Sequence, residues 1–242
     1  MTPTSIKNVR LLESGKGISK GSLSFLDGSI VAQVSALTTL DGKDFLLTPG
    51  CIDIHTHGIE QYLYEVSPEQ FLAATTCLAR HGTTSVCPTL YTVMDHASLG
   101  KLEILANTID QVTDVCIPGL HLEGPFLGLP GAGAMTLDGD VGLLNELLAA
   151  TGNRVAVMSI GPEQKNIVPV IERLVEAGVM PLITHTRADI DQTQKAIDAG
   201  ARHATHFYDV FHVPGPANSG VRPVGAVEVI LADRRCTVDF IA

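Results

Sequence analysis

The sequence is poor in charged side chains and lacks the features that mark membrane and secreted proteins. Only 17% of its 242 residues are charged, and no apolar run approaches the roughly 20 residues of a membrane-spanning helix. Residues 1–7 carry no apolar stretch of the kind found in a signal peptide. The five cysteines are odd in number and form no Cys-X-X-Cys pair, which favours reduced thiols over a disulfide framework. We therefore expect a cytoplasmic protein with no membrane association.

Positive charge is also scarce. The formal net charge of -10 argues against a nucleic acid or an anionic membrane surface as the partner. No Gly-X-Gly-X-X-Gly follows the first buried strand-like segment, so a dinucleotide site has little support. An anionic small substrate is still possible, but it would need local cations or helix N-termini.

The organisation of the chain changes near residue 48. Before it, short β-like segments alternate with turn signals such as Asp27-Gly28 and Asp41-Gly42, where glycine tolerates the positive φ of a hairpin turn. The segments are 9–12, 22–25, 29–34 and 45–48. We predict a small β module at residues 1–48 and a larger α/β domain at residues 49–242.

Strand-like and helix-like segments alternate in the larger domain. The strands begin at Cys51 and continue at 83–87, 115–122, 154–160, 179–184, 203–207 and 236–241. The first predicted helix begins after the cap Ser67, with Gln70 closing a capping box, and ends near residue 82. The next three are predicted at 97–111, 141–150 and 167–177. A further helix begins after the cap Asp189 and ends at residue 199, and the last is predicted at 225–232. This alternation predicts a parallel sheet, as in a TIM-type (β/α)8 barrel that lacks its last unit at the C-terminal end. An open doubly wound sheet is the alternative.

Metal-ligating residue types stand at the ends of four predicted strands. They are His55, His57, Glu123, His185 and His206. In a barrel these ends face one mouth, and four imidazoles with a carboxylate suit one or two divalent ions, Zn or Fe above all. The competing interpretation gives each histidine a local role. We assign that role to His81, His96, His203 and His212 as helix-terminal or loop histidines, whereas His121 remains open between a local role and support of the ligands.

Four motifs carry a resemblance to a known family. They are Pro49-Gly-Cys-Ile-Asp-Ile-His-Thr-His-Gly58, His121-Leu-Glu-Gly-Pro-Phe126, Thr184-His185-Thr186 and Thr205-His206. The chain resembles the amidohydrolase superfamily and, within it, the N-acetylglucosamine-6-phosphate deacetylases. Strand four contains no lysine that could become the carboxylated metal bridge of most superfamily members, and the resemblance implies that Glu123 takes that place.

The resemblance also implies an activity: metal-dependent hydrolysis that deacetylates an N-acetylated amino sugar phosphate by metal-activated water. It places Glu123, His185 and His206 on the main ion and His55 with His57 on a second one. It suggests a homodimer. The general-base aspartate of the family is expected beyond Ala242, and Asp239, which we place inside the seventh strand, is not a substitute.

The sequence departs from the family where the substrate binds. After the strand-six histidine, where the family usually has an Asn-Ala pair, this chain reads Phe207-Tyr208-Asp209-Val210, and an ionised Asp209 would repel a phosphate. Met135 stands in the 131–135 loop in place of a substrate-contacting histidine. Arg222 matches the family's phosphate-binding arginine, which reaches the neighbouring subunit's site, and a solvated loop arginine is the alternative interpretation. Two alternatives therefore stay open: another amidohydrolase reaction, such as cyclic amide opening or deamination, and a catalytically incomplete barrel fragment that only binds metal.

Overall fold

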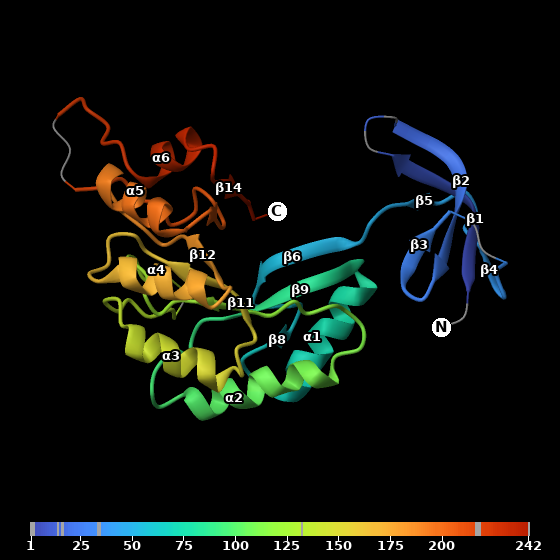
Figure 1. Cartoon of the computed structure of the whole chain (residues 1–242), viewed down its shortest axis with the longest axis horizontal. Coiled ribbons are helices and arrows are strands. Elements are labelled where there is room, and N and C mark those ends of the chain that lie inside the picture. The colour runs from blue at the N-terminus through green and yellow to red at the C-terminus, as the bar shows by residue number, and fades with distance from the viewer. Residues whose placement is uncertain are drawn as a thin grey trace. The chain divides into compact units, whose positions relative to one another are not determined.

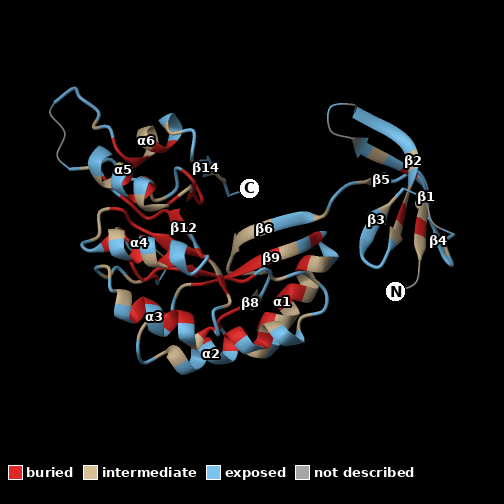
Figure 2. Ribbon diagram, in the orientation of Figure 1, coloured by how far each residue is buried: buried red, intermediate tan, exposed pale blue. Residues whose placement is uncertain are grey.

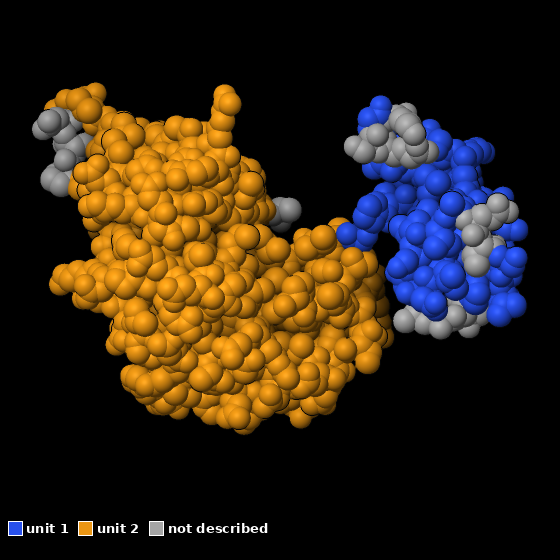
Figure 3. All heavy atoms as spheres, viewed as in Figure 1, with its two compact units in different colours: residues 1–50 blue, residues 51–242 orange. Residues whose placement is uncertain are grey.

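The computed structural model divides the chain into two compact units, residues 1–50 and 51–242, which Figure 3 distinguishes by colour. It describes residues 3–13, 15, 17–32, 35–131, 133–215 and 219–241, except for the side chain of Glu13.

The first unit is a small β-sheet arranged around one long strand. Its strands are β1 (Thr4–Glu13), β2 (Gly17–Leu26), β3 (Ser29–Val31), β4 (Thr38–Asp41) and β5 (Leu46–Leu47). Strand β1 pairs with β2 in antiparallel fashion and with β4 and β5 in parallel. Among its described residues, Val9 is the one hydrophobic side chain that is buried. Several of its large hydrophobic side chains, among them Ile30, Leu37 and Phe45, are exposed.

The two predicted hairpin turns of this unit have different outcomes. Asp27 and Gly28 connect the antiparallel strands β2 and β3 with φ values of 51° and 80°, as predicted. The prediction at Asp41-Gly42 is wrong, because β4 and β5 both run parallel to β1. The segment predicted at 29–34 is a strand only to Val31, and its residues 33 and 34 lie outside the described part of the chain.

The second unit contains a parallel sheet that follows the order of the sequence. Its strands are β6 (Cys51–Thr56), β9 (Thr83–Leu90), β10 (Leu120–Glu123), β11 (Val155–Ile160), β12 (Met180–Ile183), β13 (His203–Ala204) and β14 (Thr237–Val238). Each strand pairs with the next one in the chain, without the reversal of order that a doubly wound sheet requires. This confirms the predicted TIM-type arrangement, of which the described residues supply seven strands.

Helices follow one another along the outer side of this sheet (Figure 1). They are α1 (Pro68–Arg80), α2 (Leu99–Thr108) with the short 3-10 helix η1 (Ile109–Gln111), α3 (Val141–Ala150), α4 (Ile167–Glu176), α5 (Ile190–Ala199) and α6 (Ala226–Ala232). Their apolar faces and the strands share one core, which appears as the buried band in Figure 2. No helix among the described residues is long and apolar enough to cross a membrane.

Both predicted helix caps are present, but only one is a complete capping box. Asp189 accepts from the backbone N–H of Gln192, whose side chain accepts from the backbone of Asp189. Ser67 accepts from the N–H of Gln70, yet the side chain of Gln70 accepts from Leu63 instead of closing the box. Leu63 belongs to a hairpin that the sequence did not predict, β7 (Gly58–Ile59) and β8 (Tyr62–Leu63).

Three strands are much shorter than predicted, and one of them is β14, which covers only Thr237–Val238 of the predicted 236–241. Residues 115–119 join the sheet only through a bridge at Cys116, because Pro118 has no N–H and Gly119 packs against Ala156. Strand β13 ends at Ala204, and His206 then adopts a left-handed φ of 37°. The carboxyl ends of the strands thus turn sharply where the predicted ligands begin.

Replacing Asp189 by alanine should lower the free energy of unfolding by about 1 kcal/mol, because helix α5 loses the acceptor at its first turn. Urea denaturation followed by circular dichroism would measure the change. Lys195→Ala, at an exposed position of the same helix, serves as the control and should change stability by less than about 0.5 kcal/mol. Equal effects of the two substitutions would contradict the role of the cap.

Candidate metal centre

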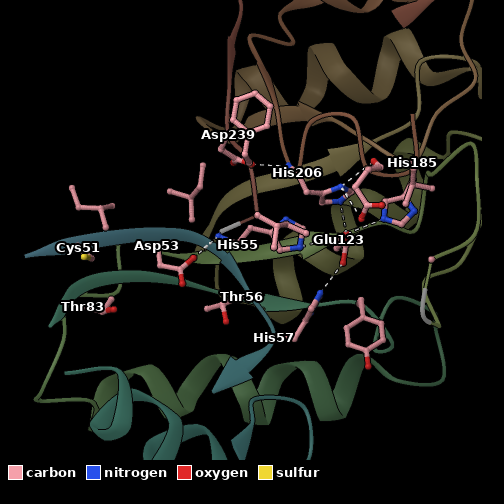
Figure 4. A pocket seen from close by; sticks show the side chains of 18 residues that line it. Cys51, Asp53, His55, Thr56, His57, Thr83, Glu123, His185, His206 and Asp239 are labelled. Carbon is pink, nitrogen blue, oxygen red and sulfur yellow. Dashed lines mark hydrogen bonds and ion pairs between the residues drawn. The ribbon is translucent and has the colours of Figure 1, made fainter. Parts of the chain in front are cut away.

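A pocket of about 820 Å³ runs along strand β6 toward the carboxyl ends of the sheet. Figure 4 shows four histidines turned toward one carboxylate at this end. His55 lies in β6, His57 directly follows it, Glu123 ends β10, and His185 and His206 follow β12 and β13. We call these five side chains the Glu123 cluster.

Every imidazole of the cluster approaches Glu123. The Oε1 atom lies 3.5 Å from Nε2 of His55, 3.2 Å from Nε2 of His185 and 3.3 Å from Nε2 of His206. The Oε2 atom lies 3.2 Å from Nε2 of His57. His55 and His57 reach the same group because residues two apart on an extended strand point to one side.

The other nitrogens of two of these rings are occupied by backbone carbonyls. Nδ1 of His57 lies 3.4 Å from the carbonyl oxygen of Thr89, and Nδ1 of His206 lies 3.2 Å from that of Asp209. A carbonyl oxygen only accepts, so in both rings Nδ1 carries the proton and donates. In the neutral state, Nε2 of His57 then faces a carboxylate oxygen as a bare acceptor, whereas Nε2 of His206 also has the hydroxyl of Thr184 at 2.8 Å. Two acceptors facing each other need a cation between them, either a proton or a metal ion.

Burial and charge act in opposite directions on these groups. Burial alone would raise the pKa of Glu123, but hydrogen bonds from the four imidazoles lower it far below its usual range. Burial alone would lower the pKa of His57 and His206, but their hydrogen bonds to Glu123 and its charge raise it. The site therefore favours an ionised Glu123 with positive charge beside it, which a proton or a metal ion can supply.

The donor set of the cluster fits a divalent metal. Glu123 forms one triad of possible ligand atoms with His55 and His57 and a second triad with His185 and His206, the atoms of each lying within 4.8 Å of one another. Nδ1 of His185 is buried and has no hydrogen-bond partner. Imidazole and carboxylate donors around a shared acidic residue suit Zn(II) or Fe(II), alone or as a pair.

His121 lies directly behind the cluster and is fully buried. Its Nδ1 donates to the carbonyl of Ile54 at 3.0 Å, so its Nε2 accepts from the hydroxyl of Ser159 at 2.8 Å. Its ring centroid lies 4.7 Å from that of His55. Burial first, and then nearby His55, lowers the pKa of His121 to about 3. The ring is neutral at pH 7 and adds no charge beside the ligands.

Asp239 organises the opposite side of the cluster. It lies just beyond β14, whereas the sequence placed it inside the strand. Its oxygens accept from the backbone N–H of His206 at 2.6 Å, from the hydroxyl of Thr205 at 3.0 Å and from Nε2 of His203 at 2.9 Å. Thr205 in turn contacts Nδ1 of His55 at 3.0 Å. Asp239 thereby links two predicted ligands through their backbone and side-chain partners.

The four histidines expected to have local roles differ in their settings. His203 is buried in strand β13 and bonded to Asp239, so the prediction of a helix-terminal or loop position is wrong for it. His81 caps the C-terminus of α1, and His96 pairs with Glu146 at the surface. His212 is in a loop segment after the cluster.

The proposed substrate-binding residues are less concentrated than the cluster. Asp209 lines the pocket, and its carboxylate lies 4.0 Å from Nδ1 of His206. Tyr208 is exposed and its ring lies 4.6 Å from that of Phe207. Met135 packs against the core, and its loop includes Ala132, which lies outside the described residues. Arg222 is exposed and pairs with Glu228 at 3.3 Å.

Sequence reasoning missed the side chains that hold the ligands in place. Besides Asp239 and Thr205, buried Glu65 accepts from the N–H groups of Tyr91 and Thr92 at 2.8 and 2.9 Å. The ring of Tyr91 then packs at 4.7 Å from that of His57. The only sequence signal was an acidic residue within a largely apolar stretch.

Comparison with known proteins identifies this arrangement. The chain matches the family model described as the amidohydrolase family over residues 46–237. It belongs to the amidohydrolase family.

The relatives of this amidohydrolase confirm the predicted resemblance to deacetylases. It is 29% identical to the N-acetylglucosamine-6-phosphate deacetylase of Lysinibacillus sphaericus, over 98% of this chain and 64% of that protein. It is 27% identical to the N-acetylgalactosamine-6-phosphate deacetylase of Escherichia coli O157:H7, over 96% of this chain and 62% of that protein. A solved structure of an N-acetyl-D-glucosamine-6-phosphate deacetylase mutant of Mycobacterium smegmatis, in complex with N-acetyl-D-glucosamine-6-phosphate, aligns with a TM-score of 0.80 and 27% identity. The alignment covers 99% of this chain and 62% of that one. The chain spans less than two thirds of these relatives' length.

Gly131 offers a test of the cluster in this amidohydrolase. Its loop is fixed to the ligand, because the N–H of Leu129 donates to the carbonyl of His185 at 2.7 Å. A Cβ atom at Gly131 would overlap the ring of His185. Gly131→Ala should therefore displace His185 and reduce zinc affinity by about tenfold or more. Zinc retained after dialysis against a weak chelator, measured by mass spectrometry, reports the change.

The matched control is Gly100→Ala, because a Cβ atom there meets nothing within 4 Å. This variant should retain the zinc content of the parent chain. Unchanged zinc retention in Gly131→Ala, with the fold intact by circular dichroism, would contradict the assignment of His185.

Proposed function

We propose that this chain is the metal-binding part of a hydrolase that deacetylates an N-acetylated amino sugar phosphate of the N-acetylglucosamine-6-phosphate type. The observation that carries the proposal is the convergence of four imidazoles on the buried Glu123 at the strand ends of an amidohydrolase sheet. The names of the relatives support the substrate class.

The proposed ligands are the five side chains of the Glu123 cluster. Glu123 would be shared, His185 and His206 would complete the main site, and His55 and His57 would complete a second one. When bound, a divalent ion polarises the amide carbonyl and lowers the pKa of water to about 7. One or two ions, Zn(II) or Fe(II), satisfy this donor set.

The chain's own residues prepare the site in several ways. The carbonyls of Thr89 and Asp209 fix the tautomers of His57 and His206, so that both rings direct Nε2 inward. His121 supports the cluster from behind as a neutral ring. Asp239 uses both carboxylate oxygens as acceptors, and we assign it a positioning role. We assign no general base among the described residues.

The substrate contacts are part of the same proposal. Asp209 would lie beside the sugar at the pocket wall, with Tyr208 and Met135 further out. Arg222 would reach the neighbouring site of a homodimer, after exchanging its partner Glu228 for the phosphate.

One observation favours a second candidate, another amidohydrolase reaction on a neutral or cationic amide. The described residues that line the pocket include no lysine or arginine, whereas Asp53, Asp209 and Asp239 are among them. A dianionic phosphate placed among these carboxylates would be repelled. Cyclic amide opening and deamination need no anionic group on the substrate.

Acetate release from a panel of substrates tests the proposal. The metal-loaded complete protein should release acetate from N-acetylglucosamine-6-phosphate or its galactosamine epimer, and Glu123→Gln should lower the rate by about a hundredfold or more, because both ligand triads lose their shared carboxylate. Glu146→Gln, at an exposed residue paired with His96, is the matched control and should be as active as the parent.

The panel also separates the alternatives. Opening of a cyclic amide, or release of ammonia, without acetate from either sugar phosphate would favour the second candidate. Stoichiometric metal with no turnover of any substrate would overturn both reactions and leave metal binding as the function of this chain.

A further inference from the structure

A second group of metal-ligating side chains lies outside the pocket. Glu60, Cys77 and His81 each offer one ligand atom, and these atoms lie within 4.8 Å of one another. We call them the α1 cluster. It shares no residue with the Glu123 cluster, and its carboxylate and imidazole side chains are 52% and 59% exposed.

Helix geometry brings two members of the α1 cluster together. Cys77 lies in the last turn of α1, and His81 is the residue that caps it. The backbone N–H of His81 donates to the carbonyl of Cys77 at 3.2 Å, which closes a regular helical turn. Residues four apart on a helix lie on one face, so the thiol and the imidazole are neighbours.

The third member comes from the β7–β8 hairpin. Glu60 follows β7 at the two-residue turn, and the hairpin packs along α1. At the other end of the hairpin, the N–H of Leu63 donates to the side chain of Gln70 in the first turn of α1 at 3.2 Å. The hairpin is thus held against the helix, and its turn presents Glu60 to the end of α1.

The spacing and chemistry of the α1 cluster suit zinc. Nε2 of His81 lies 3.5 Å from Oε1 of Glu60, and zinc bonds of about 2.0–2.3 Å at tetrahedral angles place neighbouring ligand atoms about 3.3–3.8 Å apart. Thiolate, imidazole and carboxylate are all common zinc ligands, and three protein ligands leave a fourth position for water. We propose that Glu60, Cys77 and His81 form a second, peripheral Zn(II) site.

The surroundings of the Cys77 thiol, which include the Glu60 carboxylate, change its acidity. Partial burial first, and then the charge and hydrogen bond of Glu60, raise the pKa of Cys77. The thiol therefore keeps its proton at neutral pH when no metal is bound. Zinc replaces that proton when it binds, as it does in other thiolate sites.

A bound ion would cross-link the hairpin to α1 close to the first metal centre. The hairpin begins one residue after His57, and the N–H of Tyr64 donates to the carbonyl of His57 at 3.1 Å. The peripheral site would therefore steady the segment that carries one ligand of the Glu123 cluster. This role is independent of the reaction proposed above.

Cobalt(II) distinguishes the two sites, because only a thiolate ligand gives sulfur-to-cobalt charge-transfer absorption in the near ultraviolet. The Glu123 cluster contains nitrogen and oxygen donors alone. The reduced chain titrated with cobalt should develop this band, and zinc should then abolish it, because zinc binds such sites more tightly. Cys77→Ser should remove the band, and His81→Gln should weaken cobalt binding at the band by about tenfold or more.

Cys51→Ser is the matched control, since Cys51 is the cysteine that lines the pocket. This variant should keep the full band. Absence of the band in the parent chain, its survival in Cys77→Ser, or its loss in Cys51→Ser would each overturn the proposal. Circular dichroism of every variant excludes loss of fold as the cause.

Discussion

The larger unit of this protein depends on one buried carboxylate, that of Glu123, on which four imidazoles converge. Glu123 ends strand β10, an interior strand of the sheet, and imidazoles from both directions along the sheet approach its two oxygens. A buried carboxylate without partners is costly, and four neutral imidazoles would relieve that cost only in part. A shared cation satisfies the carboxylate and the rings together, so the arrangement of strand ends and the binding of an ion are one physical requirement.

The same requirement explains why the strands end where they do. His185 and His206 adopt φ values of 45° and 37°, a conformation that costs a non-glycine residue about 1–3 kcal/mol. Hydrogen bonds around each residue hold it there: Thr186 donates to the carbonyl of Val210, and His206 donates to Asp239. The sheet therefore gives up regular pairing at β12 and β13 in order to direct two rings inward.

The sequence was sufficient for the features that depend on local order. Alternation along a strand placed His55 and His57 on one side, and the βα repeat placed the other ligands at one edge of the sheet. It was insufficient where a partner lies far along the chain. Gln70 satisfies the unforeseen hairpin instead of its own helix cap, and Asp239 meets His203 and Thr205 only because β13 and β14 pair in a particular register.

The contrast between features set by local sequence order and features set by distant partners also applies to function. The proposed hydrolysis follows from residues that the strand order brings together, whereas the proposed recognition of a phosphate would depend on cations delivered by loops or by a second subunit. Arg222 pairs with Glu228, and the described wall of the pocket carries Asp209 and other carboxylates. An anionic substrate would therefore need positive charge from outside this wall, beyond that of any ion bound at Glu123. The reaction class is consequently better supported by the structure than the charge of the substrate.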